Sequence, residues 1–255
     1  MLAQERQSII LEMLKTKNVI KITDIATRFD VSNETARRDL EAMQNRRLVR
    51  RVYGGAVLEA TQAESTNVSV LTDRDAMEKA ALGKAAAALV KEGDVIIIGP
   101  GTTMWELAKN IRHMHNLTVL TTSLAVSNEL AGTSIELYVL GGLVQPDELC
   151  MTGAIPMATM QRFFADKSFI SCGGATLSGG VSDYTAGGEL LHTMIERANH
   201  SVLVANSVKF GQNAFGYICA LNELNTIISD TGLSPDYQDG IRRQKMDLIL
   251  VDVEG

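Results

Sequence analysis

The chain has 255 residues, of which 45% are hydrophobic and 21% are charged. Such a composition excludes fibrous, collagenous and disordered proteins and is typical of a globular chain. No apolar run approaches the roughly 18 residues of a membrane span, and Met1–Arg6 is too polar for a signal peptide, so we expect a cytoplasmic protein without a membrane partner. Three cysteines without a CxxC spacing argue against a disulfide framework and a zinc site, and we expect neither metal nor cofactor.

The formal net charge of −6 conceals two oppositely charged parts. Residues 1–55 contain 11 lysines and arginines against 7 acids, a net charge of +4, whereas the other 200 residues contain 13 against 23, a net charge of −10. Between them, Glu59–Thr72 is polar and lacks a hydrophobic period, which is typical of an exposed connector. We therefore predict a small basic domain at 1–57, a linker at 58–74 and a large acidic domain at 75–255.

The basic domain has the pattern of a helix-turn-helix. Helical spacing of apolar residues predicts a first helix over Gln4–Thr16 and a second over Thr23–Phe29. After a three-residue break, the Ser32 side chain can cap a third helix by accepting a backbone N–H bond. Three residues give that helix an apolar stripe: Ala36, Leu40 and Met43. Leu48–Val52, followed by Tyr53-Gly54-Gly55, then predicts a basic β-hairpin, or wing.

The stripe leaves polar and basic side chains on the outer faces of the third helix. In a major groove, Arg can bind guanine through two hydrogen bonds, Asn can bind adenine, and Thr can contact phosphate or a thymine methyl group. Arginines of the wing would add sequence-independent affinity for the DNA backbone. The predicted DNA-binding residues are Ser32, Asn33, Thr35, Arg37, Arg38, Arg50, Arg51 and Tyr53. The alternative is a solvated helix face, on which the arginines pair with Glu34, Asp39 and Glu41.

Two segments of the basic domain resemble a known family. The run ITDIATRFDVSNETARRDL at Ile22–Leu40, followed by RRVYGGA at Arg50–Ala56, is similar to the N-terminal signature of DeoR-type bacterial transcriptional regulators. This resemblance implies a winged helix-turn-helix that binds double-stranded operator DNA, commonly as a repressor of sugar-metabolism genes. It extends through nearly the whole chain.

The acidic domain alternates short apolar strands with helices. The predicted strands are Val95–Ile98, Thr118–Thr121, Glu136–Leu140, Lys167–Cys172, Ser201–Ala205, Thr226–Ser229 and Asp247–Val251. The predicted helices are Ala76–Val90, Thr103–Ile111, Leu124–Ala131, Met157–Phe164, Glu189–Ala198 and Pro235–Arg243. This alternation predicts a Rossmann-like, mainly parallel α/β sheet with helices on both faces.

Loops rich in Gly, Thr and Ser follow several of these strands, at the edge where parallel sheets bind ligands. Backbone N–H groups and hydroxyls at the start of a helix suit a phosphate or another anion. Glycines at strand ends would let the backbone approach a ligand, and Lys209 supplies a cation. The predicted effector-binding residues are Gly101, Thr102, Thr103, Thr121, Thr122, Ser123, Gly141, Gly142, Gly173, Glu189 and Lys209. Each loop taken singly is also consistent with a plain turn.

The acidic domain is similar to the C-terminal sensor domain of the same family. The matching segments are Gly101-Thr102-Thr103, Thr121 with Ser123, Gly141-Gly142, Lys209-Phe210-Gly211 and Asp230. The resemblance implies a fold related to ribose-5-phosphate isomerase and an effector that is a phosphorylated sugar or a related anionic metabolite. The chain departs from the family pattern at Gly99-Pro100 (usually Asp-Ser), Thr122 (usually Asn), Gly173 and Asn206 (usually Asp) and Leu191 (usually Lys). These departures keep the anion-binding loop but alter the polar residues around it.

Two other functions remain open from the residues alone. An isomerase or deaminase would need a positioned acid or base, for which Glu189 and His192, one helical turn apart, are the best pair. Because the acids wanted at Gly173 and Asn206 are missing, we expect no catalysis. His113 and His115 lack further metal ligands nearby. Alternatively, the acidic domain only oligomerises, as a homodimer or homotetramer that presents paired recognition helices to DNA half-sites.

Overall fold

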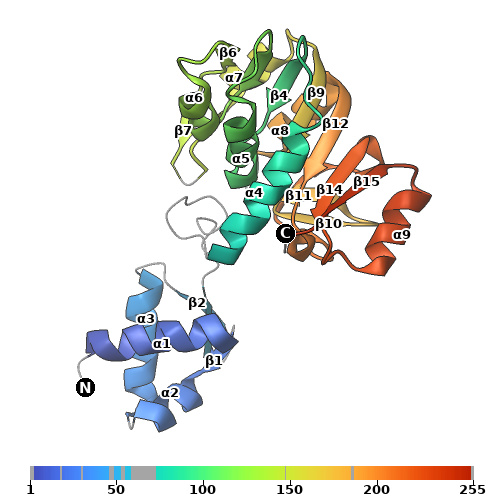
Figure 1. The fold of residues 1–255 in the computed structure, drawn as a ribbon. Coiled ribbons are helices and arrows are strands. Elements are labelled where there is room, and N and C mark those ends of the chain that lie inside the picture. Colours follow the sequence, from blue (N-terminus) through green and yellow to red (C-terminus); the bar gives the residue numbers. More distant parts are fainter. Residues whose placement is uncertain are drawn as a thin grey trace. The chain divides into compact units, whose positions relative to one another are not determined.

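The computed structural model describes residues 3–17, 19–29, 31–45, 49–52, 55–58, 73–146, 148–184 and 187–253. The chain divides into two compact units, an N-terminal unit at Met1–Glu64 and a C-terminal unit at Ser65–Gly255 (Figure 1). The predicted connector, Glu59–Thr72, lies outside the described residues. The domain boundaries given above therefore stay a prediction.

The described part of the N-terminal unit combines helices with a small antiparallel sheet. Its elements are α1 (Ala3–Lys17), β1 (Val19–Lys21), α2 (Ile22–Phe29), α3 (Asn33–Asn45), β2 (Val49–Val52) and β3 (Gly55–Leu58). The strands pair in the order β1-β3-β2. This arrangement confirms the predicted helix-turn-helix and hairpin. The sequence did not predict β1, because a strand of three residues is too short to show an alternating pattern.

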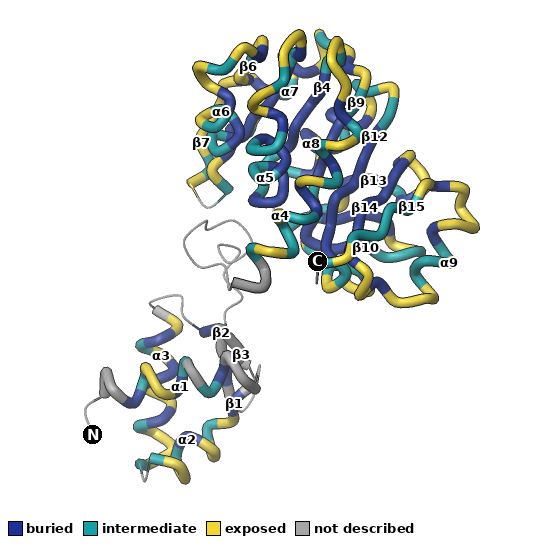
Figure 2. The backbone as a smooth tube through the Cα atoms, viewed as in Figure 1, coloured by how far each residue is buried: buried dark blue, intermediate teal, exposed yellow. Residues whose placement is uncertain are grey.

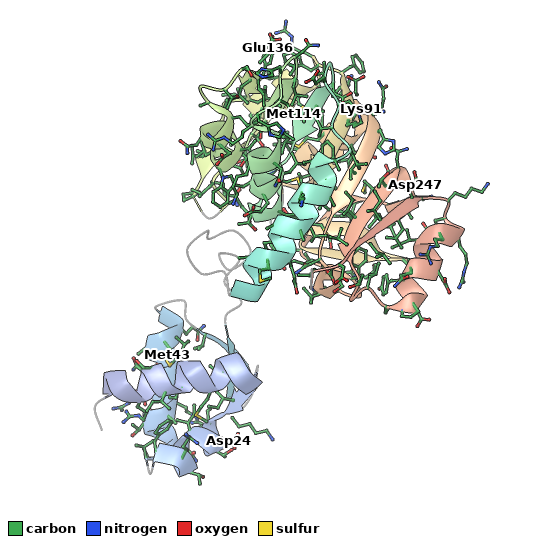
Figure 3. All side chains as sticks on the ribbon, viewed as in Figure 1. Asp24, Met43, Lys91, Met114, Glu136 and Asp247 are labelled. Carbon is green, nitrogen blue, oxygen red and sulfur yellow. The ribbon has the colours of Figure 1, made fainter. Side chains whose placement is uncertain are left out.

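The apolar stripe of α3 forms the centre of the N-terminal unit. Ala36, Leu40 and Met43 are completely buried, as predicted, and Met43 is labelled in Figure 3. They pack with Ile10 of α1 and Ile25 of α2, which are also completely buried. The recognition-type helix is therefore held by apolar contacts with both preceding helices.

A buried ion pair also joins α1 to α3. Arg6 Nε lies 2.5 Å from Asp39 Oδ2, and Gln7 Nε2 donates to Asp39 Oδ1 at 3.2 Å. Arg6 is 8% exposed and Asp39 is 4% exposed. Asp39 is thus a structural residue, which corrects the alternative reading in which it serves as a surface partner for the arginines of α3.

The C-terminal unit is built on a seven-stranded parallel sheet. The strand order is β15-β14-β12-β9-β4-β5-β6, and every neighbouring pair is parallel. The strands are β4 (Val95–Ile98), β5 (Thr118–Thr121), β6 (Glu136–Val139), β9 (Ala165–Ile170), β12 (Ala198–Val204), β14 (Thr226–Asp230) and β15 (Asp247–Val251). Figure 2 shows the inner strands buried, whereas β6 is exposed at one edge. The predicted mainly parallel α/β fold is confirmed.

Helices cover both faces of this sheet. They are α4 (Asp73–Ala87), α5 (Thr102–Ile111), α6 (Leu124–Leu130), α7 (Ala154–Met160), α8 (Gly188–Glu196) and α9 (Pro235–Arg243). Side chains alternate along β4, so Ile96 and Ile98 pack with α4, α5 and α6, whereas Ile97 packs in the core beneath α7, α8 and α9. At Gly83, α4 approaches α5 so closely that an added Cβ would lie 2.5 Å from Glu106 Cβ.

Several short strands were not predicted. They are β7 (Leu143–Gln145) and β8 (Cys150–Thr152), which form a hairpin, and β10 (Gly174–Thr176), β11 (Gly180–Asp183) and β13 (Gly216–Cys219), which form a second antiparallel sheet. Several predicted boundaries were also wrong: the helix placed at Ala76–Val90 is α4 at Asp73–Ala87, and the strand placed at Ser201–Ala205 is β12, which starts at Ala198. The helix placed at Met157–Phe164 starts at Ala154, since Pro156 is tolerated in a first turn. The strand placed at Lys167–Cys172 is β9, because pairing with β12 begins at Ala165.

All seven parallel strands end at one edge of the sheet, called here the carboxyl edge. In Figure 3 the labels Lys91, Met114, Glu136 and Asp247 mark the opposite edge, because each residue precedes or begins a parallel strand. The carboxyl edge therefore lies at the other end of the strands, where α5, α6 and the loop after β12 begin. Among the described helices, none is long and apolar enough to cross a membrane.

Candidate functional site

The start of α3 presents four of the eight predicted DNA-binding side chains to solvent. Ser32 Oγ accepts the Thr35 backbone N–H at 3.1 Å, which confirms Ser32 as the N-cap. Asn33, Arg37 and Arg38 are exposed, whereas Thr35 is half-buried and its hydroxyl lies 2.9 Å from Ser32 Oγ. Arg38 lies on the face opposite the buried stripe, whereas Asn33, Thr35 and Arg37 lie on its flanks; their contact with DNA stays a prediction.

Arg38, an exposed arginine of α3, has a weak internal partner. Arg38 Nε lies 3.6 Å from Glu34 Oε1, and the two side chains are 78% and 63% exposed. Such a pair contributes little in water, so Arg38 can exchange it for a phosphate or a base edge at small cost. Arg50 and Arg51 lie on β2, but their side chains and Tyr53 are outside the described residues.

In the C-terminal unit, the predicted effector loops lie in a row along the carboxyl edge. The sheet order β12-β9-β4-β5-β6 places the loops that carry Lys209, Gly173, Gly101, Ser123 and Gly141 one after another. Neighbouring strands are about 4.8 Å apart, so the row extends roughly 19 Å from β12 to β6. A small metabolite can therefore contact only part of it.

The loop after β4 leads directly into α5. Gly101 is the N-cap residue with φ 117°, and as a glycine it supplies no side-chain cap to α5. A Cβ at Gly101 would lie 2.6 Å from Ser171 Oγ, so the loops after β4 and β9 touch at this glycine. Thr102 and Thr103 follow as buried residues of the first turn. The arrangement directs the positive N-terminal end of α5 toward the carboxyl edge.

Hydroxyls of the loop after β5 hold the loop in shape. Thr121 Oγ1 donates to the Ile98 carbonyl at 2.7 Å and accepts the Ser123 N–H at 3.0 Å. Ser123 Oγ accepts the Val126 N–H at 3.3 Å and so caps α6. Thr122 Oγ1 is buried and has no hydrogen-bond partner among the described residues. The Thr121 hydroxyl is therefore occupied in holding the loop after β5 against β4, so we expect it to affect an effector only through the position of that loop.

The loops after β9 and β12 meet at a tyrosine that the sequence did not single out. A Cβ at Gly173 would lie 3.0 Å from the Tyr184 ring, so only glycine fits there without displacement. Lys209 Nζ donates to Tyr184 Oη at 2.8 Å. Burial raises the pKa of the neighbouring Asp183 carboxyl, while the Tyr184 backbone N–H and the Lys209 ammonium oppose that shift. Lys209 is thereby held at the carboxyl edge as a positioned cation.

Other predicted effector residues are less closely connected to this cluster. Gly141 and Gly142 follow the edge strand β6, and a Cβ at Gly142 would lie 2.7 Å from the Thr152 carbonyl oxygen, so this glycine permits close packing. Glu189 is exposed in the first turn of α8. Within the described part of the chain, no hydrogen bond or ion pair joins its side chain to the loops. Its ligand role stays a prediction.

The groups considered for catalysis or metal binding lie elsewhere. His192 Nε2 is 3.6 Å from Glu196 Oε1, one turn further along α8. The three cysteines are free and buried, and burial raises the pKa of each thiol to about 12. Among the described residues, no group of three or more His, Cys, Asp or Glu could hold a metal ion.

A recess opens on the carboxyl edge between the loops after β4 and β5. It is lined by Gly101, Thr102, Trp105, Ser123, Ala125, Glu148 and Leu149 and has a volume of about 10 Å³, which is the room of roughly one water molecule. Trp105 and Glu148 were not predicted; Trp105 lies one turn after Thr102, whereas Glu148 reaches the recess only through the unpredicted β7–β8 hairpin. A larger open hollow of about 390 Å³ lies by the C-terminal ends of α4 and α5, whose carbonyls disfavour an anion.

Comparisons with known proteins agree with both units. Residues 6–62 match the DeoR-like helix-turn-helix domain, and residues 74–231 match the DeoR C terminal sensor domain. The uncharacterized HTH-type transcriptional regulator YulB of Bacillus subtilis (strain 168) is 32% identical over 98% of each chain. The HTH-type transcriptional repressor GlcR of the same organism is 28% identical over 99% of this chain and 98% of its own. Ribose 5-phosphate isomerase A from Methanocaldococcus jannaschii aligns over 55% of each chain with a TM-score of 0.39 and 17% identity. The chain belongs to the DeoR family of helix-turn-helix transcriptional regulators, with a C-terminal sensor domain.

Proposed function

We propose that this regulator represses a carbohydrate-metabolism operon and is released from its operator by a phosphorylated sugar or a related anionic metabolite. The observation that supports the proposal is that the positive N-terminal end of α5 and the Lys209 ammonium both lie at the carboxyl edge. β4 and β12 are separated by two strand steps, roughly 10 Å, which a monosaccharide phosphate can bridge. The relative GlcR is named as a transcriptional repressor, which supports repression rather than activation.

Asn206 connects this site to the helix that follows the linker region. Asn206 Nδ2 donates to Glu78 Oε2 at 3.3 Å, and Asn206 lies in the same loop as Lys209. Glu78 is in α4, which begins at Asp73. An anion bound near Lys209 would compete with the Glu78 carboxylate for the Asn206 amide. A thousandfold loss of operator affinity requires roughly 4 kcal/mol of coupling between the two sites.

We further propose that the regulator acts as a homodimer or homotetramer. Two α3 helices related by a two-fold axis would contact half-sites about 34 Å apart, or a multiple of that distance. Light scattering of the full chain, alone and with DNA, tests this part. A monomer bound to a single half-site would contradict it.

The central experiment measures operator binding and its relief. The full chain selects duplexes from random DNA, and anisotropy then follows release by a panel of sugar phosphates. Thr102→Glu and Lys209→Met are expected to abolish release while operator affinity stays within about twofold of wild type. Lys91→Met, at the opposite sheet edge, is the matched control for Lys209→Met.

A second pair of variants separates DNA contact from effector sensing. Arg37→Ala is expected to weaken operator binding by about 1–3 kcal/mol if Arg37 reads a base, with sugar-phosphate binding unchanged. Arg243→Ala, an exposed arginine of α9 in the C-terminal unit, serves as its control. Selection of no DNA by the wild-type chain, or release by no member of the panel, would count against the proposed function.

A further inference from the structure

We infer that β6, the open edge of the parallel sheet, pairs with the same strand of a second copy of this chain. The surface consists of the outer side of β6, strand β7 of the following hairpin and the start of α7. The inference rests on the proposed homodimer or homotetramer and adds to it the surface and the strand register by which two copies associate.

Five large apolar side chains are exposed on this surface, from Tyr138 at 39% to Leu143 at 75% (Figure 2). They are Tyr138 and Val139 of β6, Leu143 and Val144 of β7, and Ile155 of α7. Two contacts bring their strands and helix together. Leu143 pairs with Thr152, three residues before Ile155, and a Cβ at Gly142 would lie 2.8 Å from Pro156. The five side chains therefore belong to one surface.

The size of this apolar surface fits a dimer. The exposed parts of the five side chains amount to roughly 500 Å², at the upper end of the apolar patches found on monomers. A stable dimer buries about 800 Å² on each subunit, and about two thirds of a homodimer interface is apolar. The five side chains supply about that apolar share.

Charge is nearly absent from the segment that forms this surface. Leu137–Gln161 contains two charged residues among 25, Asp147 and Glu148, whereas 21% of the whole chain is charged. The segment contains no Lys or Arg, which disfavours a nucleic acid or an anionic membrane as the partner. Residues 56–255 carry a net charge of −10, so two copies repel each other over most of their surfaces. Two acidic copies therefore meet at least electrostatic cost on this surface.

The backbone of β6 offers hydrogen bonds along the same edge. The Leu140 N–H donates to the Thr121 carbonyl at 2.9 Å, and the Glu136 N–H donates in the same way to the residue before β5 at 3.0 Å. Leu137 and Val139 alternate with these residues, so their N–H and C=O groups point away from the sheet. Within the described part of the chain, no strand pairs with that side of β6. Such an open strand edge readily binds another strand.

The other edge strand of the sheet, β15, is less accessible. Its apolar residues, Leu248–Val251, are half-buried and pack into the two cores beside the sheet. Of the two sheet edges, β6 is therefore better suited to a partner strand.

The open backbone groups select one register for the pairing. A two-fold axis between two copies sets their β6 strands antiparallel. When the axis passes beside Tyr138, Leu137 of each copy lies opposite Val139 of the other, and all their outward N–H and C=O groups are bonded. A shift by one residue would set Val139 opposite Ile135, whose N–H already donates to Thr133 Oγ1 at 3.3 Å. Tyr138 therefore faces its own counterpart, with the two Cα atoms about 4.5 Å apart.

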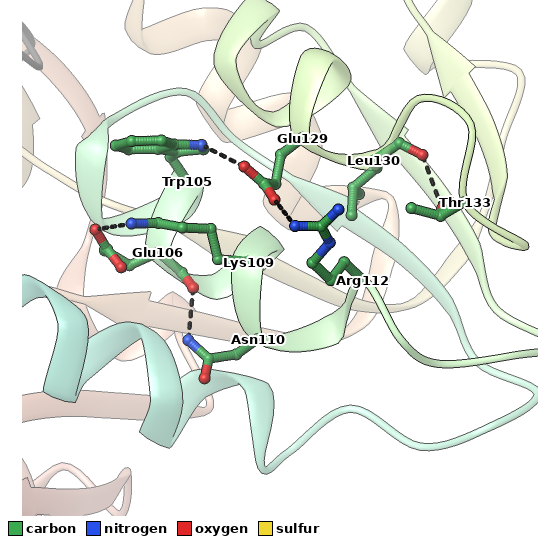
Figure 4. A network of polar contacts seen from close by, with 8 residues as sticks. All are labelled: Trp105, Glu106, Lys109, Asn110, Arg112, Glu129, Leu130 and Thr133. Atoms are coloured by element: carbon green, nitrogen blue, oxygen red, sulfur yellow. Dashed lines mark hydrogen bonds and ion pairs between the residues drawn. The ribbon is translucent and has the colours of Figure 1, made fainter.

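The helix beside β6 is fixed in place, so this edge of the sheet is preformed. Glu129 of α6 accepts a hydrogen bond from Trp105 Nε1 at 3.1 Å and lies 3.3 Å from Arg112 Nη1, which ties α6 to α5 (Figure 4). Thr133 Oγ1 donates to the Leu130 carbonyl at 2.7 Å and holds the turn that leads toward β6. A preformed edge loses little conformational entropy when a second copy binds.

Analytical ultracentrifugation of the full chain measures the association. Leu143→Glu places a charge in the apolar surface, and Val139→Pro removes an outward N–H group while the bonds between β5 and β6 remain. Each variant is expected to raise the dissociation constant of the dimer at least about hundredfold, with the wild-type far-ultraviolet circular dichroism spectrum. Phe215→Glu is the matched control, because Phe215 is an exposed apolar residue beside β13 of the second sheet. It should leave the dissociation constant within about twofold of wild type.

Cysteine cross-linking of the full chain tests the register. Tyr138→Cys is expected to form a disulfide between two copies under mild oxidation, because a Cα separation of about 4.5 Å is within the range of disulfides. Glu136→Cys, two residues away on the same strand, is the control; its counterparts would lie about 13 Å apart and should not cross-link. The three native cysteines are buried and do not compete.

Three outcomes would overturn the inference. They are dimers that persist in both Leu143→Glu and Val139→Pro, dissociation caused by Phe215→Glu instead, and a cross-link in Glu136→Cys but not in Tyr138→Cys. If Val139→Pro does not fold, Leu143→Glu carries the test, because Leu143 is on the surface. A wild-type chain that is monomeric both alone and on DNA would instead refute the proposed oligomer itself, so the two failures are distinguishable.

Discussion

Replacing Asp39 with Ala is expected to destroy DNA binding without removing any DNA contact. Asp39 is 4% exposed and accepts hydrogen bonds from Arg6 and Gln7, so its loss leaves the Arg6 guanidinium buried without its carboxylate. Breaking a buried ion pair in this way costs about 3–5 kcal/mol. A unit the size of Met1–Glu64 has a total stability of only about 3–10 kcal/mol. The substitution therefore removes a large part of what keeps α1 and α3 together.

Calorimetry of the full chain is the assay, because the two units are expected to give separate transitions. Asp39→Ala should lower or abolish the transition of the N-terminal unit and leave that of the C-terminal unit in place. Glu41→Ala, an exposed position on the same helix, is the control and should change stability by less than about 0.5 kcal/mol. The double variant Arg6→Met with Asp39→Leu should recover most of the stability, since apolar side chains can replace a buried pair. A single Asp39→Ala variant within about 1 kcal/mol of wild type would refute the reasoning.

Four further outcomes are expected. Gly101→Ala, with φ 117° and a Cβ 2.6 Å from Ser171 Oγ, should cost about 1–3 kcal/mol and weaken sugar-phosphate binding in thermal-shift titrations, and an unaltered titration would contradict the anion-loop assignment. Arg38→Ala should weaken operator binding by about 1–3 kcal/mol in anisotropy, with normal affinity counting against α3 as the reading helix. Burial raises the pKa of the Asp183 carboxyl above 3.8, so the folded state binds the carboxyl proton more tightly than the unfolded state. The free energy of unfolding therefore falls as the pH rises from 3.8 through the raised pKa. Asp183→Asn should stabilise the chain at pH 7 and less so at pH 4, as measured by paired melting curves. Glu78→Ala should shift the sugar-phosphate dose for operator release by up to about tenfold while direct binding changes little, and equal shifts in both would argue against coupling through Asn206.

Elements with continuous β-branched runs or clear caps were predictable from the sequence. β4, β5 and β15 lie at the residues predicted, because each is a short apolar run bounded by turn residues. The start of α3 was equally clear, since Ser32 precedes an apolar stripe at helical spacing. That the strands of the sheet are mainly parallel was predicted from their alternation with helices alone.

The remaining parts of the site depend on contacts between distant segments. β7 and β8 have three residues each and are defined by pairing with each other, so Glu148 could not be placed beside the loop after β5. Tyr184 reaches Lys209 only because β11 joins a second sheet. Asp39 looked like a surface partner because its buried partner, Arg6, lies 33 residues away on another helix. Local periodicity carries no information about such contacts.

The close approach of α4 and α5 at Gly83 has a consequence for how such regulators can be recombined. Gly83 lies against the Cβ and backbone of Glu106 and the backbone nitrogen of Leu107, so we expect that the two helices cannot rotate independently without a clash. A tilt of α5 is thereby transmitted to α4, the helix with which the described C-terminal unit begins. A chimaera that replaces everything before Asp73 would keep the packed α4–α5 pair intact, and we expect it to inherit the ligand response of the protein that donates the sensor domain. A junction placed inside α4 would combine halves of the helix from two proteins and could lose the close contact between Gly83 and Glu106.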